Sequence, residues 1–171
     1  THKLDGHVPF PLTLELARAG HHVVGVDRSE HMLDRLRARL AVEPQDVRQR
    51  VELVQGDFTS VRLNRRFALI MLPFNAVHHC RSTTQVLELL DTVSLHMFEN
   101  SRFVLDMYLP DPQLYVRDPA RRYEERWFEH PETGQELFSW EQAEYDVLTQ
   151  IHRVTYVYQY PDGHSDAVRL E

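Results

Sequence analysis

The first part of the chain alternates short apolar runs with segments in which apolar residues recur at helical spacing. The spacing predicts a helix over 11–19, closed by Gly20, and a second helix over 30–40 that Ser29 begins. Between them, the valines of 23–26 predict a buried strand, because β-branched residues favour extended backbone. This alternation is typical of an α/β fold with a parallel sheet.

The same pattern continues to about residue 110. Apolar residues over 51–54 predict a second strand, and the uninterrupted apolar run of 67–72 predicts a central parallel strand buried on both faces. Ser82 opens a capping box, which predicts a helix to about Phe98. Its expected buried positions are Val86, Leu90, Val93 and Met97. A further buried strand is expected at 103–106.

After residue 110 the pattern changes to aromatic and β-branched residues without helical spacing. Three such segments, at 123–129, 135–145 and 151–160, predict an antiparallel sheet. The residues of 131–134 predict one turn, and the Asp-Gly step at 162–163 is typical of a hairpin turn. The sequence therefore predicts an α/β core over 1–110 and an antiparallel β extension over 111–171.

Composition narrows the classes of partner. A net charge of −7 argues against a nucleic-acid backbone as the main ligand, because phosphate binding requires unbalanced Lys and Arg. Cys80 is the single cysteine, which excludes an intrachain disulfide and favours the cytoplasm. No apolar run is long enough to span a membrane, and the first residues lack the pattern of a signal peptide.

Two acids follow predicted strands in matching positions. Asp27 ends the strand at 23–26, and Asp57 follows the strand at 51–54. At the carboxyl edge of a parallel sheet, a carboxylate can accept hydrogen bonds from both hydroxyls of a ribose. The alternative for either acid is a simple helix cap or a surface residue. The two together favour a nucleoside-containing cofactor.

Over residues 11–108 the chain resembles the class I S-adenosylmethionine-dependent methyltransferases. The residues that carry the resemblance are Leu14 to Gly20, Val23 to Asp27, Ser29 with Met32 and Leu33, Gly56-Asp57-Phe58, and Leu72-Pro73-Phe74-Asn75. Their joint spacing is more specific than any one motif. The resemblance implies a doubly wound, Rossmann-like methyltransferase sheet. The β extension is similar, more weakly, to members that act on small molecules.

The resemblance also implies how the cofactor S-adenosylmethionine is held. Asp27 would bind the ribose hydroxyls, and Asp57 would accept from the adenine amino group. Met32 would lie against the adenine and Phe58 beside it.

Other residues complete the implied cofactor site. Leu72 and Phe74 would line the methionine end, and Arg28 and Gly56 are the remaining cofactor-binding candidates. The implied reaction moves a methyl group to a nitrogen or oxygen atom of a small molecule.

One family feature is missing from the sequence. The family's first strand and its glycine-containing turn would fall immediately before the helix at Pro11, and no two of the six glycines have the required spacing. Either this member has lost its cofactor loop, or a segment is missing between Phe10 and Pro11. The second explanation is favoured, because a sheet without its central strand would leave unpaired edges.

His78 and His79 follow the central strand, where ligands of α/β sheets bind, and are the catalytic candidates. A hydroxyl acceptor would need one of them as a general base, whereas a neutral amine would need none. Metal binding with Cys80 is disfavoured, because adjacent residues cannot all point at one ion. The alternative is that one histidine fills the loop and the other faces water.

Two other functions stay open. The first is a nicotinamide-nucleotide oxidoreductase, which would also use Asp27 but does not require Asp57-Phe58. The second is a non-catalytic relative that has lost its loop and dimerises through the β extension. Tyr156, Tyr158 and Tyr160 either cover a substrate or form the packed face of that sheet. The extension is expected either to pair with a second copy of itself or to cover the substrate mouth, because exposed sheet edges rarely stay bare.

Overall fold

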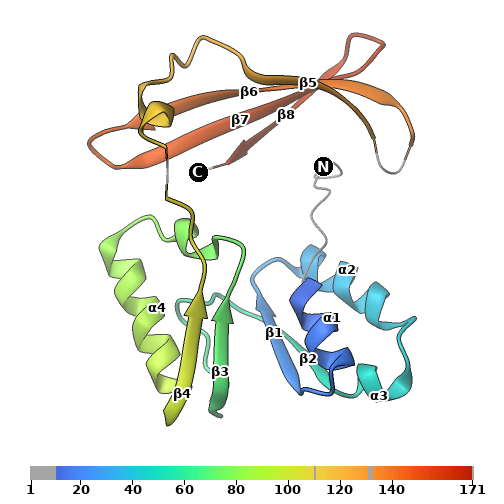
Figure 1. Cartoon of the computed structure of the whole chain (residues 1–171), viewed down its shortest axis with the longest axis vertical. Coiled ribbons are helices and arrows are strands. Elements are labelled where there is room, and N and C mark those ends of the chain that lie inside the picture. Colours follow the sequence, from blue (N-terminus) through green and yellow to red (C-terminus); the bar gives the residue numbers. More distant parts are fainter. Residues whose placement is uncertain (1–10, 110, 131–132, 171) are drawn as a thin grey trace. The chain divides into compact units, whose positions relative to one another are not determined.

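The computed structural model describes residues 11–109, 111–130 and 133–170. By their contacts, these residues form two units, 11–107 and 108–170 (Figure 1). The expected junction between Phe10 and Pro11 and the first two residues of the predicted turn at 131–134 lie outside the described residues.

The first helices and strand form where the sequence predicts them: α1 is Pro11–Arg18, β1 is Val23–Asp27 and α2 is Glu30–Leu40. Gly20 ends the first helix with a φ of 96°, a conformation that favours glycine, and its N–H donates to the carbonyl of Ala17 at 3.0 Å. Ser29 begins α2, because its hydroxyl accepts from the Met32 N–H at 3.4 Å.

A first parallel pair joins β1 to β2, Val51–Gln55, after the short helix α3, Gln45–Arg48. The register places Val23 opposite Val51 and Asp27 opposite Gln55. Both α1 and α2 contact these two strands. Leu33 and Leu36 on α2 are fully buried, so the apolar stripe of this helix forms the core beside β1 and β2.

A second parallel pair joins β3, Phe67–Leu72, to β4, Met97–Leu105. The 3₁₀ helix η1, Ala76–His79, and α4, Thr83–Leu95, connect the two strands. The core of this pair contains Leu72, Leu89 and Val93.

The structure corrects two expectations for α4. The helix ends at Leu95 and not near Phe98, because Met97 already pairs with Phe67 as the first residue of β4. Leu90 was predicted to be buried but is 45% exposed, whereas its neighbour Leu89 is 2% exposed. Consecutive residues of an α-helix differ in direction by about 100°, so Leu89 faces the core and Leu90 does not.

The predicted burial of β3 on both faces is also wrong. Leu69 is 45% exposed, and on the neighbouring strand Val104 is 47% exposed. Within the described residues β1–β2 and β3–β4 are separate two-stranded sheets, so β1 and β3 share no ladder hydrogen bonds. Each of these strands therefore has one edge without a ladder partner.

The C-terminal unit is the predicted antiparallel sheet, of strand order β5-β6-β7-β8. Its elements are η2, Pro112–Val116, β5, Tyr123–Glu129, β6, Glu136–Asp146, β7, Ile151–Gln159, and β8, Ser165–Leu170. The Asp-Gly turn joins β7 to β8, with Gly163 at a φ of 86°. The tight turn from Asp146 to Gln150 was not predicted, because it contains neither glycine nor proline.

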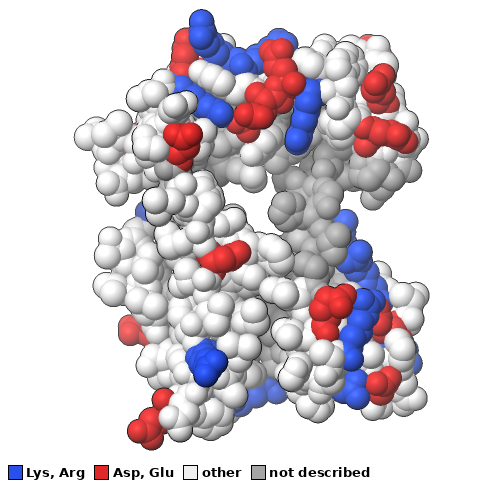
Figure 2. Space-filling model, in the orientation of Figure 1, with Lys and Arg blue, Asp and Glu red and all other residues white. Residues whose placement is uncertain are grey.

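Charges of both signs are interspersed on the face shown in Figure 2. The region where Figure 1 places α4, β3 and β4 shows few charges. No helix in the described ranges has the length and apolar character needed to cross a bilayer.

Candidate functional site

Both predicted acids lie at the carboxyl ends of neighbouring parallel strands. Asp27 is the last residue of β1, and Asp57 follows β2 by two positions. The Gly56 N–H donates to the Asp27 carbonyl at 3.0 Å, which extends the pairing of the two strands up to Asp57. The two acids therefore share one edge of the sheet.

Each acid uses one carboxylate oxygen to stabilise its own turn. Oδ1 of Asp27 accepts from the Ser29 N–H at 2.7 Å. Oδ1 of Asp57 accepts from the N–H and the hydroxyl of Thr59, at 2.8 and 2.6 Å. Within residues 11–109, 111–130 and 133–170, neither Oδ2 accepts a hydrogen bond. One oxygen of each acid thus stabilises a local turn, neither acid is the cap of a described helix, and the second oxygen can accept from a ligand.

Local hydrogen bonds keep Asp57 ionised. The hydroxyl and the N–H of Thr59, and then the positive charge of Arg28, lower the pKa of this carboxyl against a smaller opposing effect of burial. An ionised carboxylate is the stronger acceptor for a ligand amino or hydroxyl group.

The histidines of η1 lie within electrostatic reach of this edge. Desolvation lowers the pKa of His79, and the positive charges of Arg28 and Arg81 lower it further, while Asp27 raises it. The imidazole is therefore neutral at pH 7, the form that can accept a proton. Both His78 and His79 are exposed to solvent on this turn.

The turn between β3 and η1 has an unusual backbone. Phe74 and Asn75 both have positive φ, 61° and 58°, a conformation that is uncommon for a bulky residue such as Phe74. The Phe74 ring is 51% exposed, and the Asn75 N–H donates to Oδ1 of Asp106, which follows β4, at 3.1 Å. The sequence indicates Asp106 as an acid at the end of a strand that could orient substrate, but it does not predict this hydrogen bond to Asn75.

The other predicted cofactor residues differ in how open they are. The Leu72 side chain is buried against Leu89 and Val93, and Phe58 packs on the same cluster. Leu72 therefore offers a ligand mainly its backbone. Met32 is half-buried at the start of α2.

Arg28 and Gly56 have local structural roles. The Arg28 side chain is exposed, and its carbonyl accepts from the Gln55 amide at 3.2 Å. A Cβ on Gly56 would lie 3.0 Å from a methyl group of Val61. Close packing against Val61 is thus sufficient to explain the glycine.

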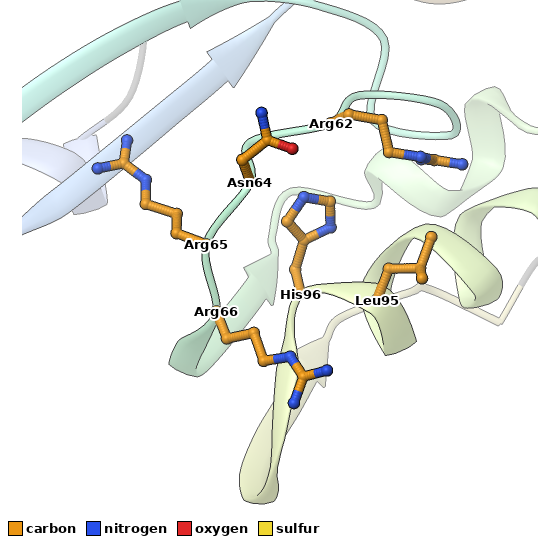
Figure 3. A pocket seen from close by; sticks show the side chains of 6 residues that line it. All are labelled: Arg62, Asn64, Arg65, Arg66, Leu95 and His96. Carbon is orange, nitrogen blue, oxygen red and sulfur yellow. The ribbon is translucent and has the colours of Figure 1, made fainter.

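A hollow at the amino end of β3 is lined by Arg62, Asn64, Arg65, Arg66, Leu95 and His96 (Figure 3). The three arginine side chains point in different directions in Figure 3. Arg62 donates to the Thr92 hydroxyl at 3.0 Å, and Arg65 pairs with Glu52 at 2.6 Å. Because the guanidinium groups do not converge, the hollow is not built as an anion site.

The described part of the chain contains no cluster of side chains that could hold a metal ion. No three residues of the His, Cys, Asp and Glu types lie there close enough together to hold an ion. Burial, and then the negative charge of Asp57, raise the pKa of the Cys80 thiol, which disfavours the thiolate that binds metals.

Comparisons with known proteins place this geometry in a family. Residues 11–95 match the model of a family described as "Methyltransferase domain", from the start of α1 to the end of α4. No curated protein sequence matches the chain significantly.

Several solved structures share the fold. The CcbJ methyltransferase from Streptomyces caelestis has a TM-score of 0.69 at 21% identity, over 91% of this chain and 59% of that one. The glycopeptide N-methyltransferase MtfA, complexed with S-adenosyl-L-methionine, has a TM-score of 0.58 at 23% identity, over 93% of this chain and 64% of that one. The sugar N-methyltransferase KedS8 from Streptoalloteichus sp. has a TM-score of 0.55 at 16% identity, over 86% and 55%. The chain thus spans about three fifths of the length of these structures.

The parallel strands, their helices and the acids at the strand ends define an α/β protein of the Rossmann-like class with an added antiparallel sheet. The match over residues 11–95 and the fold that the chain shares with solved methyltransferases support a class I S-adenosylmethionine-dependent methyltransferase.

The described residues fit the adenosine part of the family's cofactor. The unused Oδ2 atoms of Asp27 and Asp57 are acceptors on one edge, as ribose hydroxyls and an adenine amino group require. No described segment supplies the family's first strand and glycine turn.

Proposed function

We propose that this chain forms part of an S-adenosylmethionine-dependent methyltransferase that methylates a nitrogen or oxygen atom of a small molecule. The observation that carries the proposal is the pair of acids Asp27 and Asp57, which share one edge and each keep one oxygen available. MtfA and KedS8 are N-methyltransferases, which favours nitrogen.

When bound, the cofactor supplies a methyl group already activated on a sulfonium. The protein then has to hold the acceptor in line with that methyl group and exclude water. Asp27 and Asp57 would fix the adenosine, and the exposed Phe74 would lie beside the methionine end. For a hydroxyl acceptor, neutral His79 or its neighbour His78 would take the proton.

The open edges of β1 and β3 support a further parallel strand between them, followed by a glycine-containing turn. Such a strand would pair backbone groups that otherwise lack ladder partners. The intact mass of the natural protein is then expected to exceed 20.2 kDa. A mass equal to that of these 171 residues would favour the non-catalytic alternative.

Calorimetric titration with S-adenosylhomocysteine, and in parallel with NADH, tests the proposed function. We expect saturable binding of the first ligand and none of the second. Binding of NADH alone would support the oxidoreductase alternative. Absence of heat with either ligand at about millimolar concentration would overturn the cofactor assignment.

A further inference from the structure

Thr92 places a hydroxyl group on the buried face of α4. The residue is 4% exposed and lies beside the buried Leu89 and Val93, where an apolar side chain would pack without any hydrogen bond. Burial of a hydroxyl group costs free energy unless the group is hydrogen-bonded. The reason for a hydroxyl at this position therefore lies in its partners, which precede it by 30 and 33 positions in the chain.

The hydroxyl of Thr92 makes two hydrogen bonds to the loop after β2. It donates to the carbonyl of Thr59 at 2.6 Å and accepts from Nη1 of Arg62 at 3.0 Å. The same Nη1 donates to the carbonyls of Ser60 and Val61, at 3.1 and 2.9 Å, so Arg62 closes the loop onto itself. Through Thr92, the helix α4 thus holds this loop.

The loop that α4 holds carries Asp57. Thr59 donates both its N–H and its hydroxyl to Oδ1 of Asp57, at 2.8 and 2.6 Å. The N–H groups of Ser60 and Val61 donate to the Asp57 carbonyl at 3.0 and 2.8 Å, which fixes the backbone of the same turn. A single intermediate residue, Thr59, therefore links the buried hydroxyl of Thr92 to the Asp57 carboxylate by direct hydrogen bonds.

The bond between Thr92 and Thr59 also joins the two parallel pairs of strands. Asp57 follows β2 of the first pair, whereas α4 packs against β4 of the second. Within the described residues the two pairs share no ladder hydrogen bond, so this side-chain bond helps to set the place of Asp57 relative to the second pair. Burial, and then the charge of Asp57, raise the pKa of Cys80 at the end of η1, which shows that the carboxylate lies near that segment.

Thr59 governs the state of the Asp57 carboxylate. Its hydroxyl and its N–H are the two largest causes that lower the pKa of Asp57. Both bonds hold Oδ1, so they also set the direction in which Oδ2 points. A Thr59 that has lost its bond to α4 would donate less well, and the carboxylate would be less fixed.

We propose that Thr92 is a positioning residue for cofactor binding: through Thr59 it fixes the carboxylate of Asp57, so that Oδ2 stays available to the adenine amino group. This role rests on the proposed function, because it requires that Asp57 accepts from the cofactor. It goes beyond that function, since it assigns a purpose to a buried residue of α4 that touches no ligand.

The first test compares two ligands that differ only at the adenine amino position. S-inosylhomocysteine has an oxygen where S-adenosylhomocysteine has the amino group, so it cannot donate this hydrogen bond. We expect the parent protein to prefer S-adenosylhomocysteine in calorimetry, and Thr92→Val to reduce that preference about threefold to tenfold, the worth of one hydrogen bond. Thr92→Ser keeps a hydroxyl and should retain the preference of the parent.

The other variants separate positioning from folding. Thr84→Val, at an exposed threonine of the same helix, is the matched control and should leave both affinities unchanged. Arg62→Met removes the guanidinium that closes the loop and donates to Thr92, so it should reduce the preference in the same direction. It becomes the decisive variant if Thr92→Val does not fold.

A second measurement needs no ligand. NMR of the ¹⁵N-labelled full chain follows the amide proton of Thr59, which donates to Asp57. We expect its resonance to move upfield in Thr92→Val, because a weaker hydrogen bond deshields the proton less. The resonance should stay in place in Thr92→Ser and in Thr84→Val.

Equal weakening of both ligands by Thr92→Val would show a role in folding alone and would overturn the proposal. An unchanged Thr59 resonance in that variant would overturn it as well, whatever the affinities. If the parent protein binds neither ligand, the proposed function fails and this role fails with it. If the parent discriminates between the ligands and Thr92→Val discriminates equally well, only the role of Thr92 is wrong.

Discussion

The carboxylate of Asp106, directly after β4, accepts a hydrogen bond from the backbone N–H of Asn75, in the turn after β3, at 3.1 Å. Since β3 and β4 are neighbouring parallel strands, this bond joins the two chain segments that leave the same edge of the sheet. It holds a turn whose backbone is strained at Phe74.

Removal of this acceptor should loosen the turn. We expect Asp106→Ala to lower the free energy of unfolding by about 0.5–1.5 kcal/mol, and Asp106→Asn to lower it less, because an amide oxygen still accepts. Urea denaturation measures the difference, provided that the dependence of the unfolding free energy on urea concentration is the same in all variants. Stability of Asp106→Ala equal to that of the parent would show that the bond contributes nothing.

Asp27 should affect cofactor binding far more than folding. Asp27→Asn keeps an oxygen that can accept from the Ser29 N–H but removes the charge. Asp27→Ala should weaken the binding of S-adenosylhomocysteine by about 2–3 kcal/mol, or roughly 30- to 150-fold in affinity. The affinity of the Asn variant should lie between those of the parent and the Ala variant.

Calorimetry of both Asp27 variants checks this, with Asp34→Asn, an exposed acid of α2, as the matched control. Parent-like affinity of Asp27→Ala would remove this residue from the cofactor site.

The pH dependence of turnover should identify the role of His79. A general base must be neutral, and the pKa of His79 lies below its usual 6.5. For a hydroxyl acceptor, kcat/KM should therefore be flat near pH 7 and fall only as the pH drops through that lowered pKa. His79→Ala should then reduce kcat about 100-fold and leave cofactor affinity unchanged.

His78→Ala is measured in parallel, because either histidine is a candidate for the base. If both variants turn over like the parent, neither histidine is the base, and an amine acceptor methylated by positioning alone is favoured.

His96 should be required for stability and not for chemistry. It is 6% exposed, its Nδ1 lies 2.7 Å from the Thr92 carbonyl, and its Nε2 accepts from the Leu63 N–H at 3.0 Å. His96→Phe leaves both partners unpaired and should cost about 1–3 kcal/mol. Urea denaturation measures this cost, with His22→Phe, at an exposed histidine, as the control. Equal urea midpoints for the parent and His96→Phe would contradict the prediction.

Self-association through the edge of β8 is the last expectation. Leu170 on this edge strand is 51% exposed, and unpaired strand edges promote pairing between chains. Light scattering should give a dimer that Leu170→Lys weakens, while Leu148→Lys, at a 95% exposed turn position, does not. A monomer at all concentrations would contradict the homodimer.

Local sequence was sufficient for most elements of the fold. Ser29 and Gly20 bound their helices because a hydroxyl cap and a positive φ are properties of a few neighbouring residues. The acids Asp27 and Asp57 were predictable for a similar reason, since each directly follows an apolar strand.

Tertiary structure decided what depends on partners far away in the sequence. Met97 continues the apolar spacing of α4 but becomes a strand residue, because Phe67 offers it a ladder partner. The exposure of Leu69 and the separation of β1 from β3 depend on which strands lie beside them, which no local pattern encodes. The same holds for the antiparallel sheet, because only the register of β6 and β7 places Tyr145 opposite His152 and Glu141 opposite Tyr156.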